Sequence, residues 1–227
     1  MIKKITGKLY LDNFLLGILA GLAIAMGGTF FLTLVTFGQK FLGAISFCAG
    51  LITICYLGFH LYTGKIGYIL ENKRTFIISL FFMYLGNIVG AVGAGYLVGL
   101  IPEIKATATP ICYNKLITWS GAPGKSIMNM LAMSFFCGNL VFLCVDIFRK
   151  NKNHFVKVGG ILVCITTFVM MGMEHCIANM FYFAVGNMYG INPLNAILSI
   201  LLATLGNSLG SILLYVVVNN STFKKIL

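Results

Sequence analysis

Two polar segments interrupt otherwise apolar stretches of the chain, and they carry the residue types that could do chemistry. The first segment contains His60 and Thr63, and the second contains Glu174, His175 and Asn179. Both segments are flanked by glycines. Ionisable groups at membrane depth cost at least a few kcal/mol each, so they normally face a protein interior or a water path.

These residue types fit the handling of a small anion. Histidine is the side chain whose charge changes most easily near neutral pH, so His175 could stabilise an anion or lend it a proton. The Thr63 hydroxyl can donate one further hydrogen bond. Glu174 cannot share a helix face with its neighbour His175, and we expect it to orient backbone or nearby helix groups. The alternative for His175 is a hydrogen-bonded core residue that only stabilises helix packing.

The composition places these residues in a membrane. The 227 residues are 59% hydrophobic and only 9% charged, unlike a soluble globular domain. Six apolar spans are long enough to cross a bilayer, at approximately 13–37, 41–63, 76–102, 127–148, 158–185 and 193–218. We therefore predict an all-α integral membrane protein with six transmembrane helices, forming a single domain over residues 1–227.

The distribution of positive charge predicts the orientation. When alternate loops are assigned to alternate sides, most lysines and arginines, Lys224 and Lys225 among them, fall on one side. Only four lysines fall on the other side: Lys40, Lys105, Lys115 and Lys125. By the positive-inside bias, both termini of this multi-pass protein are cytoplasmic, with the helices in the cytoplasmic (inner) membrane. In a membrane protein the net charge of +11 is explained by this bias of the loops. We therefore expect membrane lipid around the protein and no nucleic-acid partner.

The two halves of the chain repeat a motif. Gly86-Asn87 in the third span and Gly206-Asn207 in the sixth both begin the pattern G-N-x-x-G. Because each half has three spans, the halves, about 1–115 and 116–227, must enter the membrane from opposite sides. This predicts an inverted 3+3 repeat with a pore beside broken helices, here the second and fifth. The alternative is that G-N-x-x-G only mediates close helix packing.

Other kinds of site find little support. The chain has no nucleotide-binding glycine motif, no H-x-x-H and no C-x-x-C, so we expect no cofactor, no metal and no enzymatic activity. A membrane-bound metalloenzyme is the alternative from another class. The seven cysteines lie mostly within apolar spans and are interpreted as small apolar fillers. Asn192-Pro193-Leu194 is vaguely like one box of a water or glycerol channel, but it has no second copy.

One motif is specific enough to indicate a family. Glu174-His175, followed by Ala178-Asn179-Met180, resembles the E-H-x-x-A-N-M signature of formate/nitrite transporters. Leu61-Tyr62-Thr63-Gly64 is similar to that family's L-F-T segment, an irregular loop within the second helix. The two Gly-Asn motifs, Asn139-Leu140-Val141 and Lys157 also fall in the family's order. The short length and cysteine-rich spans are closest to the bacterial hydrosulfide channels of this family.

The resemblance implies an aquaporin-like protomer that assembles as a homo-oligomer, a pentamer, with one pore per protomer. The implied permeants are small monovalent anions, hydrosulfide first, with formate and nitrite as further permeants. Alternatives are a proton-coupled formate or nitrite transporter and a water- or glycerol-type channel. The pore centre would hold His175 and Thr63, with Glu174 and Asn179 beside them. The apolar constrictions would be Phe47, Leu51, Leu61, Tyr62, Phe142 and Phe168, and the vestibule charges Lys125 and Lys157.

His60 departs from the family pattern, which commonly has an acidic residue before L-F-T. The resemblance therefore supports no relay through a carboxylate here, and selectivity or pH response is expected to shift. His60 has no partner in sequence, so we expect it to form an interhelical hydrogen bond.

Overall fold

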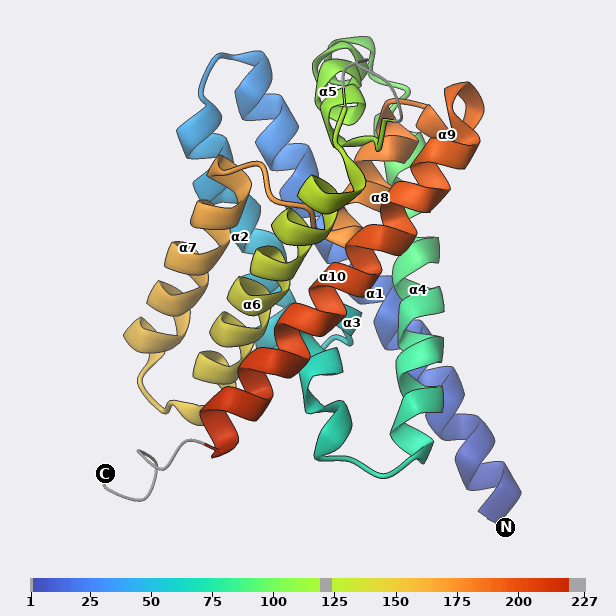
Figure 1. The fold of residues 1–227 in the computed structure, drawn as a ribbon, viewed down its shortest axis with the longest axis vertical. Coiled ribbons are helices and arrows are strands. Elements are labelled where there is room, and N and C mark those ends of the chain that lie inside the picture. The colour runs from blue at the N-terminus through green and yellow to red at the C-terminus, as the bar shows by residue number, and fades with distance from the viewer. Residues whose placement is uncertain (1, 119–123, 221–227) are drawn as a thin grey trace.

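The computed structural model describes residues 2–118 and 124–220, without the side chains of residues 2–6. Lys224 and Lys225, which the charge bias places on the cytoplasmic side, lie outside the described residues. Within the described ranges most residues are helical (Figure 1). The elements are α1 (Ile2–Thr36), α2 (Lys40–Leu57), α3 (Tyr62–Lys65), η1 (Ile66–Leu70), α4 (Thr75–Val98), α5 (Pro102–Lys115), α6 (Ile127–Lys150), α7 (His154–Met170), α8 (Cys176–Val185), α9 (Met188–Ile191) and α10 (Pro193–Asn220).

The helices match the six predicted spans. Of the described helices, α1, α2, α4, α6 and α10 are each long and apolar enough to cross a membrane. The shorter apolar helices α7 and α8 together make the fifth span in chain order. The second span is also broken, because α2 ends at Leu57 and α3 begins only at Tyr62. The prediction of an all-α membrane protein with broken helices two and five is confirmed.

Helix α5 is an element that the sequence does not predict. It contains Pro110 and alternates apolar residues with threonine and lysine, so it has no apolar span. Figure 1 shows α5 at the end of the bundle opposite the start of α1 and the end of α10. This helix therefore covers one mouth of the bundle, where the sequence alone predicts only a loop.

Glycines allow the outer helices of each half to pack closely. Helix α1 packs along α4, and α6 packs along α10. A Cβ atom on Gly90 would lie 2.2 Å from the Ile18 carbonyl oxygen, and one on Gly210 would lie 2.1 Å from the Phe135 carbonyl oxygen. Only glycine permits such contacts between helices. The small-residue interpretation of G-N-x-x-G is therefore correct for its glycines.

Each broken helix is interrupted at a glycine in the left-handed region. Gly58 has a φ of +70° and ends α2, while Gly172 has a φ of +63° and follows α7. The chain then runs extended through the N-cap of the next helix, Leu61 for α3 and His175 for α8. Residues with a Cβ rarely adopt a positive φ, so these two glycines set where the breaks occur.

The asparagine of each G-N motif satisfies backbone groups at one break. The Asn87 side chain accepts from Tyr62 N at 2.9 Å and donates to the carbonyl oxygens of His60 at 2.9 Å and Gly17 at 2.8 Å. Because no water is available in lipid, these groups need protein partners. Asn87 supplies them for the first break.

Asn207 makes the same three bonds at the second break. It accepts from Cys176 N at 2.9 Å and donates to the carbonyl oxygens of Glu174 at 2.8 Å and Ser134 at 2.7 Å. The shared pattern relates the two halves by an inverted repeat. It also makes Leu61 and His175 equivalent positions, each one residue before the amide that an asparagine binds.

Replacing Asn207 with leucine is expected to destabilise the protein by on the order of 3 kcal/mol or more, since each buried backbone group left unpaired costs about 1–3 kcal/mol. The measurement is the unfolding midpoint of the purified protein in detergent. The matched control is Asn139→Leu, because among residues 2–118 and 124–220 the Asn139 amide donates only to Phe135 O of its own helix, at 3.0 Å. Equal losses in the two variants would contradict the bridging role of Asn207.

Candidate functional site

The two breaks bring His175 and Thr63 together in the protein interior. His175 Nε2 lies 2.8 Å from Thr63 Oγ1, and both residues are buried. The Ala178 backbone N–H donates to His175 Nδ1 at 3.1 Å, so the imidazole caps α8. Because Nδ1 accepts a hydrogen bond, the proton of the neutral ring lies on Nε2 and is donated to Thr63.

This arrangement leaves one donor in reserve. Thr63 Oγ1 accepts from His175, and across residues 2–118 and 124–220 no protein group accepts the proton of the Thr63 hydroxyl. The pair therefore offers the Thr63 hydroxyl O–H to an acceptor that can reach it, and the His175 N–H as well if that acceptor displaces Thr63 Oγ1. A buried hydroxyl without an acceptor is unfavourable, which favours a visiting acceptor at this point.

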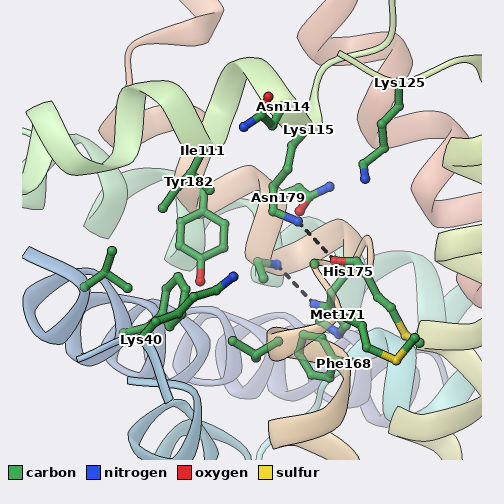
Figure 2. Close-up of a pocket in the computed structure, with 16 residues that line it drawn as sticks. Lys40, Ile111, Asn114, Lys115, Lys125, Phe168, Met171, His175, Asn179 and Tyr182 are labelled. Atoms are coloured by element: carbon green, nitrogen blue, oxygen red, sulfur yellow. Dashed lines mark hydrogen bonds between the residues drawn. The ribbon is translucent and has the colours of Figure 1, made fainter. Parts of the chain in front are cut away.

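Three cavities lie one after another through the protein, and His175 lines two of them. A cavity of about 370 Å³, here called the outer vestibule, is lined by Phe168 and His175 (Figure 2). The same two residues line a much smaller chamber of about 10 Å³. Leu61 lines both this chamber and an inner cavity of about 160 Å³. The shared residues place the cavities along one path, with His175 and Phe168 as one partition and Leu61 as the other.

The chamber between these partitions is apolar apart from one side chain. Its lining consists of Ile24, Phe47, Leu51, Leu61, Val141, Ile165, Phe168 and His175. The Phe168 ring stacks on the His175 ring at a centroid distance of 5.9 Å and meets the Phe47 ring edge-on at 5.7 Å. The chamber has room for about one water molecule. An ion that enters it must therefore lose nearly all of its hydration shell. The imidazole is the polar group that could compensate.

Glu174 is buried beside the path and is held by two lysines. Its Oε2 atom lies 3.2 Å from Lys115 Nζ, and its Oε1 atom lies 3.3 Å from Lys125 Nζ. Asn179 also donates to Oε2, at 2.6 Å. Figure 2 shows Lys115 and Lys125 extending toward the cavity above His175. The carboxylate is thus the shared counter-ion of two ammonium groups at the floor of the outer vestibule.

Lys115 also links α5 to the second break, between α7 and α8. Its ammonium donates to Met173 O at 3.0 Å, two residues before His175. On the same helix the Cys112 thiol donates to Tyr182 O of α8 at 3.0 Å. Burial raises the pKa of the Cys112 thiol to about 12, so the thiol keeps the proton that it donates. Helix α5 is therefore anchored over the outer vestibule at two points.

Four of the six predicted constriction residues meet at the chamber. Phe47, Leu51, Leu61 and Phe168 all line it together with His175. Each comes from α2, α7 or the first break, which are the elements that surround the Thr63–His175 pair. The structure thus brings these side chains together, and their role as constrictions remains a proposal.

The other two predicted constriction residues, Tyr62 and Phe142, lie away from the chamber, and their role as constrictions stays a prediction. Tyr62 begins α3 and turns toward α10, where its hydroxyl lies 3.0 Å from Ser208 Oγ. The Phe142 ring packs against the Tyr68 ring at 5.0 Å, with Tyr215 beside it. Neither residue lines any of the three cavities. Phe142 is buried and Tyr62 is partly buried, and both pack on the side that faces α10.

The two lysines predicted as vestibule charges lie at different places. Lys125 lines the outer vestibule, whereas Lys157 lies with its ammonium 4.7 Å from the centre of the Phe148 ring. The face of an aromatic ring is a favourable place for an ammonium group. Lys157 is not among the residues that line the inner cavity, and the cations that do line it are Lys65 and Arg149.

Sequence reasoning missed four cations at the mouths of the path. Lys40 and Lys115 line the outer vestibule, and Lys65 and Arg149 line the inner cavity. Lys65 follows Thr63 by two residues, a signal that could have been used. Lys115 could not be placed, because it belongs to the helix that the sequence does not predict.

His60 forms the expected interhelical hydrogen bond. Its Nδ1 atom lies 2.8 Å from Asn13 Oδ1 of α1. The Asn13 amide nitrogen donates to Leu9 O at 2.9 Å, so His60 is the donor in this pair. His60 therefore joins the first break to α1 at the position equivalent to Glu174 in the second half.

The alternative site types find no geometric support. Within residues 2–118 and 124–220, no group of three or more His, Cys, Asp and Glu side chains is arranged to hold a metal. Asn192 and Pro193 lie at the junction of α9 and α10, near the end of the bundle covered by α5 (Figure 1). They are not among the residues that line the path.

The family profile of the formate/nitrite transporters matches residues 2–220. The chain belongs to this family. It is 29% identical over 205 residues to a probable formate transporter of Methanothermobacter thermautotrophicus, covering 77% of this chain and 74% of the relative. It is 23% identical over 180 residues to the formate channel FocB of Escherichia coli, covering 74% of this chain and 64% of FocB. The chain thus spans slightly less than two thirds of FocB.

Solved structures of the family share the fold. A pentameric formate channel with formate bound matches with a TM-score of 0.70 at 22% identity, covering 96% of each chain. An ion channel of the same family matches with a TM-score of 0.70 at 20% identity, covering 90% of this chain and 86% of the other. These relatives are named as channels and transporters rather than enzymes.

Replacing Glu174 with leucine is expected to lower stability by on the order of 3 kcal/mol, because removing one partner leaves buried charges uncompensated. The unfolding midpoint in detergent measures this loss. Glu71→Leu is the matched control: it breaks the exposed pair between Glu71 and Arg149, whose atoms lie 3.3 Å apart, and should cost less than about 1 kcal/mol. A similar small loss for both variants would refute a structural role for the Glu174 cluster.

Proposed function

We propose that the protein is a channel for small monovalent anions, with hydrosulfide as its principal permeant and formate and nitrite as further permeants. The observation that carries this proposal is the position of His175. Its ring forms part of the partition between the outer vestibule and an otherwise apolar chamber. A neutral acid would cross such a chamber easily, whereas an anion needs a donor at the point where it loses its water.

In the proposed mechanism, the lysines of the outer vestibule raise the local concentration of anions. An anion then reaches His175 and competes with Thr63 Oγ1 for the imidazole N–H, while the Thr63 hydroxyl turns to donate its own proton. Two donors thereby converge on one acceptor. The anion crosses the chamber past Leu61, either weakly hydrated or as the neutral acid after taking a proton from water in the outer vestibule, and meets Lys65 and Arg149 in the inner cavity.

The small chamber supports hydrosulfide as the preferred permeant. Its volume of about 10 Å³ fits a species with a single heavy atom with less rearrangement than the planar formate or nitrite ions, which have three heavy atoms each. Proton-coupled transport of formate or nitrite uses the same residues and is the second candidate. A water or glycerol channel is less well supported, because its permeants need no cations at the mouths.

We further propose that the chain assembles as a pentamer in the cytoplasmic membrane, with both termini inside. The support for the assembly is the fold shared with a pentameric channel. The support for the orientation is the positive-inside bias, together with the start of α1 and the end of α10, which lie at the same end of the bundle (Figure 1). The repeat boundary near residue 115 remains a prediction, consistent with α5 ending at Lys115.

Replacing His175 with phenylalanine is expected to reduce anion flux at least tenfold. The change removes a hydrogen bond to the anion, and a hydrogen bond to a charged group contributes about 1.5–3 kcal/mol. The measurement is uptake into liposomes of hydrosulfide, formate, nitrite, chloride and water, across a range of pH. His154→Phe is the matched control, because His154 is exposed and its hydrogen bond to Tyr56 lies outside the path.

Several outcomes of this panel would overturn the proposal. Unchanged flux and unchanged pH dependence in His175→Phe would remove His175 from the pathway. Rapid water flux without anion flux would favour the water-channel alternative. Anion flux that stops when the proton gradient is abolished would favour the proton-coupled transporter.

A further inference from the structure

The Tyr62 side chain joins the first break to α10. Its hydroxyl lies 3.0 Å from Ser208 Oγ. Because Ser208 donates its own proton to Thr204 O at 2.6 Å, the Tyr62 hydroxyl is the donor in this pair. The backbone N–H of Tyr62 donates to Asn87 Oδ1 of α4 at 2.9 Å. Tyr62 is therefore bound to two different helices, through its backbone and through its side chain.

Tyr84 of α4 forms an equivalent bond one turn away on α10. Its hydroxyl lies 2.8 Å from Thr204 Oγ1, which donates its own proton to Ile200 O at 2.8 Å, so Tyr84 is the donor. The rings of Tyr62 and Tyr84 also meet, at a centroid distance of 4.9 Å. The two tyrosines thus make the same kind of contact with the same helix, but of the two it is Tyr62 that precedes Thr63 in the chain.

Helix α3 depends on contacts with its neighbours for its direction. It has only four residues, far fewer than the roughly 12 that make an isolated helix even marginally stable. Successive residues of a helix point about 100° apart around its axis, so a Tyr62 ring held against α10 also determines where Thr63 points. Thr63 points at His175, whose Nε2 atom lies 2.8 Å from Thr63 Oγ1.

We propose that Tyr62 is a positioning residue for the Thr63–His175 pair, and that its bond to Ser208 sets the selectivity between formate and hydrosulfide. The inference rests on the proposed channel function. A formate ion carries two acceptor oxygens at a fixed separation, so it gains from two donors that are held at a fixed spacing. Hydrosulfide carries a single sulfur, which can move to whichever donor is available. Loss of the Tyr62 bond lets Thr63 turn away from His175, and this penalises formate more than hydrosulfide.

Tyr62→Phe tests the proposal, because it removes the hydroxyl and keeps the ring. In liposomes that carry the protein, formate flux is expected to fall about three- to tenfold, as for the loss of one neutral hydrogen bond, and hydrosulfide flux less than about twofold. Ser208→Ala removes the same bond from the other side and should change the flux ratio equally. Combining the two changes should add nothing further, because both act on one bond. Ser208→Thr keeps a hydroxyl and should keep the original ratio.

Tyr84→Phe is the matched control. It breaks the equivalent bond to α10 and also keeps the ring, so it should lower the unfolding midpoint in detergent about as much as Tyr62→Phe does. The ratio of formate to hydrosulfide flux should not change, because Tyr84 does not belong to α3. If these bonds served stability alone, the two tyrosine variants would behave alike in both measurements.

A spectroscopic readout requires no transport. The NMR signal of the His175 Nε2–H group in bilayers reports the strength of its bond to Thr63, and it should shift in Tyr62→Phe but not in Tyr84→Phe. If it shifts in this way and no anion crosses, the positioning role stands and the channel function fails. If anions cross with an unchanged ratio in Tyr62→Phe and Ser208→Ala, or if Tyr84→Phe changes the ratio equally, the positioning role is wrong.

Discussion

A broken helix inside a membrane exposes backbone groups that no water can reach, and the structure depends on the side chains that bind them. Two asparagines do this, one for each half of the repeat. Asn87 and Asn207 each bridge a break to a neighbouring helix through three bonds. Without these bridges, the backbone groups at each break would lack partners, and a broken helix at membrane depth would be strongly disfavoured.

The second break links this requirement to the proposed chemistry. His175 caps α8 through Nδ1 and presents Nε2–H to Thr63. The fold thereby determines which ring nitrogen carries the proton. Under the proposed function, His175 would stabilise the backbone through one ring nitrogen and meet the permeant through the other, so its replacement is expected to affect both. The core-packing interpretation of His175 and the proposed transport role are therefore compatible with one arrangement.

Much of this arrangement could be predicted from sequence, because its causes are local. Glycines beside polar residues mark the breaks, and the repeated Gly-Asn pair marks the bridges. Side-chain direction could not be predicted in the same way. Tyr62 follows Leu61 directly, yet only Leu61 lines the chamber, because the extended backbone before α3 sends neighbouring side chains to opposite sides. Lys115 was missed because α5 lacks an apolar periodicity and gains its place through tertiary contacts.

The central claim is that the fold holds His175 as a neutral ring with its proton on Nε2. Nitrogen NMR of ring-labelled histidine in bilayers at neutral pH, with His175 assigned by comparison with His175→Phe, tests it most directly. The account predicts a protonated Nε2 and an unprotonated, hydrogen-bonded Nδ1. An imidazolium, or a proton on Nδ1, would contradict it.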